Sequence, residues 1–230
     1  MTNIHLVGGE KGGVGKSLVS RILAQYLIDR EIPFVGFDTD RSHGALMRFY
    51  PEHASPALVN HYEALDRIVE TAVENPGKRI LVDLAAQTFD PLVKWMDDSG
   101  VVNLADEMDI QVHYWHVMDC GKDSVDLLKR LLDRFGTGLR YVLVRNQLRG
   151  NDFGLLEQSG EQTRAEELGA KIITIKKLYE GVIMKIDNGS HSFAQAKSSE
   201  EDSIGFGLMD RQRVKMWLRD AYREFDDVGV

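Results

Sequence analysis

Residues 11–17 read Lys-Gly-Gly-Val-Gly-Lys-Ser and lie between an apolar run, residues 4–7, and the start of a helical pattern. The glycines allow the backbone to bend tightly, so that its N–H groups can converge on phosphate oxygens. Lys16 is placed to reach the β- and γ-phosphates, and Ser17 to hold Mg²⁺ through its hydroxyl. A helix that begins near Lys16 adds the positive end of its dipole. The stretch therefore predicts a phosphate-binding loop for a nucleoside triphosphate with magnesium.

The loop follows a variant of the usual phosphate-loop pattern. Glu10 stands where G-x-x-x-x-G-K-[ST] requires its first glycine, but K-G-G-x-G-K-[ST] is met in full. A glycine-rich turn between a strand and a helix is the alternative interpretation. The flanking patterns and the two spaced lysines favour a nucleotide site. Its expected contact residues are Lys11, Gly12, Gly13, Val14, Gly15, Lys16, Ser17 and Leu18.

The composition is that of an ordinary soluble globular chain. The 230 residues are 43% hydrophobic and 28% charged, which suits one α/β domain. A single cysteine, Cys120, excludes a disulfide framework and a cysteine metal cluster within one chain. The net charge of −8 argues against nucleic-acid binding by bulk charge. Since there is neither a long apolar run nor a leader pattern, a cytoplasmic location is expected.

Strand-like and helix-like segments alternate along most of the sequence. This alternation predicts a single P-loop NTPase domain over residues 1–230, with a mostly parallel twisted sheet and helices on both faces. Residues 149–162 are expected to form a loop and 197–207 a flexible segment. The expected strands are 4–7, 34–37, 80–82, 110–117, 141–144 and 171–175. The expected helices begin near residue 16 and cover 57–75, 89–98, 125–132, 178–187 and 209–225.

Three aspartates follow predicted strands, at the edge where ligands bind in a parallel sheet. Asp83 is expected to act on the magnesium side. Asp38 and Asp40 lie two residues apart and so share one face of an extended chain. Asp40 is the candidate that orients the attacking water, and Asp38 the candidate for metal-side support. An ordinary strand-end or turn aspartate is the alternative for each.

Asn146 follows the strand pattern at residues 141–144. Its side-chain amide offers both a donor and an acceptor, which suits the edge of adenine. A strand-capping asparagine is the alternative interpretation.

In order and rough spacing, the 11–17 loop, Asp38-Thr39-Asp40, Leu81-Val82-Asp83 and Val144-Arg145-Asn146 resemble the ParA/MinD family of deviant-Walker ATPases. The similarity covers about residues 1–147. The resemblance implies that Lys11 crosses to the nucleotide of a second subunit, so that two ATP molecules are sandwiched in a homodimer that hydrolysis releases. It further implies that Asp40 positions water, Asp83 serves magnesium and Asn146 reads adenine. The catalytic candidates are Lys11, Lys16 and Asp40.

Some positions depart from the family pattern. Asp83 is followed by Leu84-Ala85-Ala86-Gln87 where many partition relatives have two prolines, and Ile175 is followed by Lys176 where Ile-Pro is expected. These departures bear on which branch of the family the chain resembles, and less on whether it binds ATP. The Lys-Ser loop and the Asp-Thr-Asp stretch are also similar to plasmid-transfer and stability relatives.

The C-terminal helix pattern carries both basic and apolar residues. Its apolar stripe is expected to dock on the sheet, while nonspecific DNA contact through Arg211, Arg213, Lys215 and Arg219 stays open. Acidic residues that follow, among them Asp226 and Asp227, argue against a membrane anchor. A metal site at His113 and His116 is not expected, because residues three apart on a strand point to opposite faces.

The leading functional hypothesis is an ATP-driven dimerising switch that partitions or positions cargo, such as a plasmid, a chromosome region or a protein complex. Hydrolysis would be slow and stimulated by a small partner protein. A plasmid transfer or stability ATPase of the same family is one alternative. An ATP-dependent small-molecule synthetase or kinase is another, and would need a substrate pocket beside the γ-phosphate. A metal-cluster carrier, disfavoured by the single cysteine, and a pure binding module are weaker alternatives.

Overall fold

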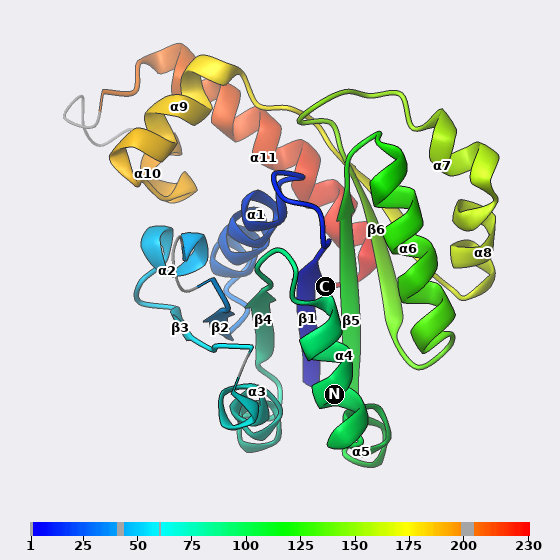
Figure 1. Cartoon of the computed structure of the whole chain (residues 1–230). Coiled ribbons are helices and arrows are strands. Elements are labelled where there is room, and N and C mark those ends of the chain that lie inside the picture. Colours follow the sequence, from blue (N-terminus) through cyan, green and yellow to red (C-terminus); the bar gives the residue numbers. More distant parts are fainter. Residues whose placement is uncertain (1, 41–43, 60, 199–204) are drawn as a thin grey trace.

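A seven-stranded parallel sheet, with strand order β3-β2-β4-β1-β5-β6-β7, forms the centre of the molecule (Figure 1). The computed structural model describes residues 2–40, 44–59, 61–198 and 205–230. The predicted α/β class with a parallel sheet is confirmed. The strands are β1 (Thr2–Gly8), β2 (Phe34–Asp38), β3 (Ala54–Pro56), β4 (Arg79–Asp83), β5 (Ile110–Met118), β6 (Arg140–Asn146) and β7 (Lys171–Ile175).

Helices cover both faces of this sheet, as Figure 1 shows. One face carries α1 (Lys16–Asp29), α2 (Ala45–Phe49), α9 (Glu180–Gly189), α10 (Phe193–Lys197) and α11 (Leu208–Val228). The other carries α3 (Tyr62–Glu74), α4 (Phe89–Asp98), α5 (Val101–Glu107), α6 (Lys122–Phe135), α7 (Gly154–Ser159) and α8 (Glu161–Glu167). A sheet covered on both sides explains why its central strands read as almost continuous apolar runs.

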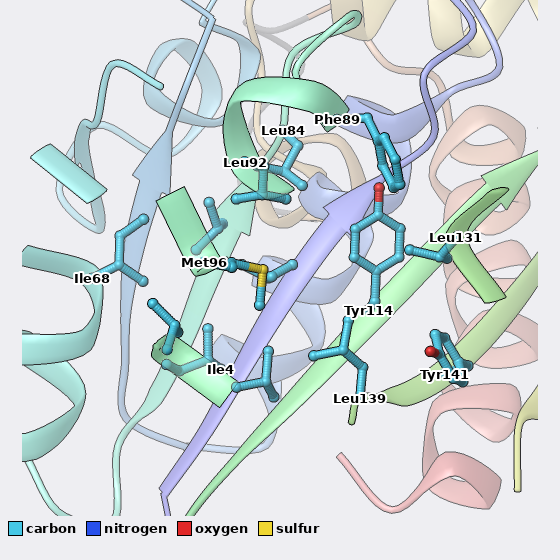
Figure 2. Close-up of a cluster of buried hydrophobic side chains, with 14 of the residues drawn as sticks. Ile4, Ile68, Leu84, Phe89, Leu92, Met96, Tyr114, Leu131, Leu139 and Tyr141 are labelled. Atoms are coloured by element: carbon cyan, nitrogen blue, oxygen red, sulfur yellow. The ribbon is translucent and has the colours of Figure 1, made fainter. Parts of the chain in front are cut away.

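Alternate residues of each strand feed two separate cores, because successive side chains point to opposite faces. In the fully buried β1, Ile4 and Leu6 enter the core under α3 to α8, whereas Val7 enters the core under α1 and α11. Figure 2 shows the first of these cores, where the ring of Tyr114 stands between Leu131 and Phe89.

The strand register brings the predicted site residues to one edge of the sheet. Val7, the penultimate residue of β1, pairs with Asp83 of β4, and Asp83 pairs in turn with Asp38 of β2. Since all of these strands are parallel, the loop that follows β1 emerges beside both aspartates. The sequence pattern alone predicts where each strand ends. The register of the sheet then shows that these strand ends are neighbours.

Several predicted boundaries were wrong. The segment 149–162, expected to be a loop, contains α7 and the start of α8, because Phe153 and Leu156 are buried in the core and hold a helix there. The helix expected over 57–75 begins only at Tyr62. The short elements α2, β3, α5 and α10 were not predicted. Of the segment 197–207, expected to be flexible, residues 199–204 lie outside the described residues.

Candidate nucleotide-binding site

The glycine loop between β1 and α1 has backbone conformations and close contacts that disfavour residues other than glycine. Gly13 and Gly15 adopt φ angles of 74° and 95°, in the left-handed region that favours glycine. A Cβ on Gly15 would lie 2.2 Å from Nδ2 of Asn146, whereas a Cβ on Gly12 would meet nothing within 4 Å. Val14 is buried, and Leu18 is partly buried against the α1 core. The loop is therefore packed on its protein side and open at Gly12.

Lys16 is a buried cation at the first position of α1. Its side chain is 7% exposed, and Nζ donates a hydrogen bond to the backbone oxygen of Lys11 at 3.1 Å. Burial lowers the pKa of this ammonium, while the carboxylates of Asp83 and Glu10 oppose the shift. An anion bound in the loop would compensate a positive charge that the protein has partly removed from water.

Asp83, at the end of β4, has one carboxylate oxygen that accepts a hydrogen bond and one that does not. Its Oδ1 accepts a hydrogen bond from Oγ of Ser20 at 2.9 Å, whereas Oδ2 is buried without a partner among the described residues. Burial and the neighbouring Asp38 raise the pKa of Asp83 to about 7, and hydrogen bonds from Ser20 and Ser17 lower it in part. An unpartnered buried oxygen beside the Ser17 hydroxyl fits the donor set of a hydrated magnesium ion.

Asp38 is engaged with the protein backbone on both oxygens. Oδ2 accepts the N–H groups of Leu46 and Met47, at 2.8 and 3.2 Å, and Oδ1 accepts that of Asp40 at 3.0 Å. Burial raises the pKa of this carboxyl group. Asp38 thus fixes the start of α2, and its metal-side role stays a prediction. Asp40 is half-buried next to it.

Thr39 joins the two segments that follow β2 and β4. Its Oγ1 donates to the backbone oxygen of Asp83 at 3.1 Å and accepts the N–H of Ala85 at 2.8 Å. A displacement of the chain near Asp40 would therefore be passed directly to the segment after Asp83.

Asn146 supports the glycine loop from within the protein. Its side chain is 1% exposed, Nδ2 donates to the backbone oxygen of Val14 at 2.7 Å, and Oδ1 accepts the N–H of Leu148 at 3.3 Å. Both halves of the amide are thus used internally. The predicted contact with adenine would require this side chain to exchange its partners.

Lys11 lies against acidic side chains of its own chain. Its Nζ is 3.1 Å from Oδ2 of Asp119 and 3.7 Å from Oδ2 of Asp123. Asp119 also accepts hydrogen bonds from Oγ of Ser124 and the N–H of Gly121, at 2.7 and 3.0 Å. Burial raises the pKa of Asp119, but these hydrogen bonds together with Lys11 outweigh it and hold the pKa below its usual value.

The sequence reasoning missed Asp119, although the signal for it was present. Asp119 directly follows β5, whereas Asp83 is the last residue of β4, so both lie at the same edge of the sheet.

A cavity of about 440 Å³ opens beside Asp38, the last residue of β2, and Asp40. It is lined by Asp38, Asp40, Gly44, Met47, Arg48, Pro56 and Leu58.

The other sequence candidates occupy structural positions. His113 stacks on His5 with ring centroids 5.0 Å apart, whereas Nε2 of His116 lies 3.1 Å from the backbone oxygen of Ser124 on the opposite face. Within residues 2–40, 44–59, 61–198 and 205–230, no three His, Cys, Asp or Glu side chains form a metal-binding group. None of the helices in these ranges has the length and apolar character that a membrane crossing requires.

The apolar stripe of α11 docks on the sheet, as predicted. Val214, Leu218 and Phe225 are all buried in the second core. The basic residues named above differ in their surroundings. Arg211 donates to the backbone oxygen of Phe206, whereas Arg213 and Arg219 pair with neighbouring aspartates.

The chain resembles known proteins in sequence and in fold. No known family model matches the chain. Protein MobD of Acidithiobacillus ferrooxidans is 28% identical over 232 residues, which cover 98% of this chain and 97% of that protein. Protein TraL of Escherichia coli is 26% identical over 244 residues and covers both chains fully, at 100%. The MinD cell division protein of Aquifex aeolicus, 14% identical, superposes with a TM-score of 0.52 over 95% of each chain. The resemblance to ParA/MinD-like P-loop proteins predicted from the motifs is thus confirmed, and the chain has the fold of MinD.

Proposed function

We propose that this chain binds ATP with Mg²⁺ in the loop of residues 11–18 and acts as a switch that dimerises on ATP and is released by hydrolysis. The observation that carries the proposal is that two buried charged groups occur at one glycine loop. They are the ammonium of Lys16 and the carboxylate of Asp83, whose Oδ2 has no hydrogen-bond partner among the described residues. The buried ammonium suits a phosphate group, and the carboxylate oxygen without a partner suits the metal ion that accompanies it.

Each residue has a defined task in this proposal. Backbone N–H groups of the glycine loop and the Lys16 ammonium bind the phosphates, and Ser17 holds the metal ion through its hydroxyl. Asp83 holds a metal-bound water, and Asp40 orients the water that attacks. When bound, Mg²⁺ neutralises charge on the β- and γ-phosphate oxygens. No residue among those described at the loop is a strong general base, which suits slow hydrolysis that a partner protein stimulates.

Lys11 would carry the switch. In the monomer its ammonium is held by Asp119. Two ATP sites that face each other bring excess negative charge together, and a lysine from each subunit can neutralise the partner's γ-phosphate. This contact exists only while the γ-phosphate is present, so the homodimer distinguishes ATP from ADP. Cargo would then be a plasmid, a chromosome region or a protein complex, with DNA contact through exposed cations of α11 if the cargo is DNA.

The proposal is tested by nucleotide binding and mass measurement on the full chain. Calorimetry should show ATP binding that depends on Mg²⁺, and light scattering should show a dimer with ATP but a monomer with ADP. Lys16→Ala should remove nucleotide binding, whereas Lys129→Ala, on the exposed side of α6, should not. Absence of ATP binding at millimolar nucleotide, or the same mass with ATP as with ADP, would refute the corresponding part.

A second candidate function draws support from the cavity beside Asp40. A volume of about 440 Å³ with carboxylates and Arg48 in its lining could admit a small substrate for an ATP-dependent synthetase or kinase. Mass spectrometry of reaction mixtures separates the two functions. The switch yields ADP and inorganic phosphate alone, whereas the enzyme yields a phosphorylated or ligated product.

A further inference from the structure

Gln87 has an unusual backbone conformation in the segment between β4 and α4. Its φ angle is 60°, in the left-handed region where a residue other than glycine costs about 1–2 kcal/mol. Three other non-glycine residues in the described part of the chain share this feature, namely Glu31, Asp109 and Ser190. Each of those three lies at or just beyond the C-terminus of a helix, where the left-handed conformation is ordinary. Gln87 instead lies in the turn between β4 and α4, where a left-handed residue shapes the path of the chain.

The segment that contains Gln87 is fastened to the nucleotide loop at both ends. At its start, the N–H of Leu84 donates to the backbone oxygen of Val7 at 3.0 Å. At its end, the N–H of Phe89 donates to Oε1 of Glu10, and Oγ1 of Thr88 donates to the oxygen of Ala85 at 2.8 Å. The backbone around Gln87 is therefore fixed relative to Glu10, the residue that precedes the phosphate loop.

This attachment limits how far Gln87 can lie from the loop. Only Thr88 separates it from Phe89, and a chain spans at most about 3.6 Å per residue, so the Cα atoms of Gln87 and Phe89 are within about 7 Å of each other. The side chain is exposed and has no partner among the described residues, whereas its neighbours Thr88 and Phe89 are buried. Gly12, the open position of the loop, follows Glu10 by two residues. The segment that carries the Gln87 amide is thus tied, through Phe89 and Glu10, to the residue that precedes the loop.

We propose that Gln87 positions the attacking water in ATP hydrolysis, an inference that rests on the proposed function. An amide oxygen can accept a hydrogen from the water while the amide N–H donates to a phosphate oxygen, which aligns the water with the γ-phosphorus. The water oxygen forms a bond to the γ-phosphorus as the bond to the β–γ bridging oxygen breaks. ADP leaves with that electron pair, and both hydrogens of the water go to inorganic phosphate.

Gln87 supplies what Asp40 cannot. An ionised carboxylate only accepts hydrogen bonds, so Asp40 can orient the water but cannot hold a phosphate oxygen. Asp40 lies in the segment after β2 and Gln87 in the segment after β4, and Thr39 joins these two segments. A glycine at position 87 would suit the left-handed backbone better.

The experiment compares Gln87→Ala and Gln87→Gly with Gln212→Ala, an exposed glutamine on α11. Affinity for MgADP alone and for MgADP with aluminium fluoride, a mimic of the transferring phosphoryl group, is measured for each full-length variant. Hydrolysis is followed under single-turnover and steady-state conditions, and the melting temperature by calorimetry. The transition-state mimic gives a readout that does not depend on turnover.

Both Gln87 variants should bind MgADP as the wild type does, but bind the aluminium fluoride complex about tenfold more weakly and lose at least tenfold in kcat with little change in KM. Gln87→Gly should also melt higher, since it relieves the backbone. Gln212→Ala should match the wild type throughout. Unchanged mimic affinity and kcat in both variants would overturn the inference, as would a wild type that binds ATP without hydrolysing it or binding the mimic. A wild type that binds no ATP would instead refute the proposed function.

Discussion

The Nζ atom of Lys11 lies 3.1 Å from Oδ2 of Asp119 in the same chain, although 108 positions separate the two residues. Lys11 belongs to the glycine loop after β1, and Asp119 directly follows the neighbouring strand β5. The Lys11 side chain is 25% exposed and that of Asp119 is 7% exposed. The pair therefore holds the loop lysine in its own subunit, and a lysine that crosses to a second subunit has to leave Asp119.

Asp119→Asn should favour the ATP-dependent dimer. The substitution removes the charge that holds Lys11 but keeps an Oδ1 acceptor for Ser124 and Gly121. A partly exposed ion pair contributes about 1 kcal/mol, which corresponds to about a fivefold lower dimer dissociation constant with ATP. Light scattering across a range of protein concentrations measures this constant.

The matched control is Asp123→Asn. Asp123 lies farther from Lys11, at 3.7 Å, and its side chain is 75% exposed, so the dimer should change by less than about twofold. Lys11→Ala should weaken the dimer and leave nucleotide binding by the monomer intact. A weaker dimer in Asp119→Asn, at an unchanged melting temperature, would contradict the role assigned to this pair.

Gly15→Ala and Gly12→Ala should have different effects. The first should disturb the loop backbone, and the second should only crowd the bound ligand. At Gly15 a Cβ would meet Nδ2 of Asn146 at 2.2 Å with φ at 95°, so we expect a loss of about 1–3 kcal/mol in stability and of nucleotide binding. At Gly12 the added methyl group meets no protein atom within 4 Å. Gly12→Ala should therefore melt like the wild type and show its effect only when ATP is added. Equal melting temperatures for the two variants would contradict this account.

The sequence predicted those parts of the site whose chemistry is local. A strand, a glycine loop and a helix are contiguous, so this strand–loop–helix unit could be predicted at residue level, and Asp38 and Asp83 were found because each ends an apolar run. The partnership of Lys11 with Asp119 could not be predicted in this way, since it depends on which strands become neighbours in the sheet.

The same limit explains the errors in the fold. α7 was missed because its six residues include a glycine and only a short apolar pattern, and its helix is held by the burial of Leu156 rather than by propensity. For Asn146 the sequence could not predict the hydrogen bond that Nδ2 donates to the Val14 oxygen, and its contact with adenine stays a prediction.

Asp83→Asn should stabilise the nucleotide-free protein at alkaline pH. Burial, and then Asp38, raise the pKa of Asp83 from 3.8 to about 7 in the folded state, so the folded protein binds this proton more tightly than the unfolded chain. The stabilisation from that proton is full below about pH 4 and is lost as the pH rises through 7. An asparagine keeps the acceptor for Ser20 and cannot ionise.

The measurement is the melting temperature of both proteins between pH 5 and pH 8.5 without nucleotide. At pH 8.5 the variant should melt higher by on the order of 5 °C, and the difference should shrink toward pH 5. Magnesium-dependent ATP binding should be weakened at every pH. Ser159→Ala, far from this carboxylate on α7, provides the control for a general effect of substitution. A constant difference across the pH range would contradict the raised pKa.

Asn146→Ala should distinguish two roles of this side chain, support of the glycine loop and contact with the adenine base. The wild-type side chain donates to the Val14 oxygen from a position that is 1% exposed, so its removal leaves a buried carbonyl unpaired and a small void. We expect a loss of about 1–3 kcal/mol in stability and a similar loss of affinity, about tenfold, for ATP and for inorganic tripolyphosphate. Calorimetry with both ligands and with GTP measures the three affinities. If Asn146 instead contacts adenine, the variant will lose affinity for ATP while tripolyphosphate binding stays unchanged, and the preference for ATP over GTP will disappear.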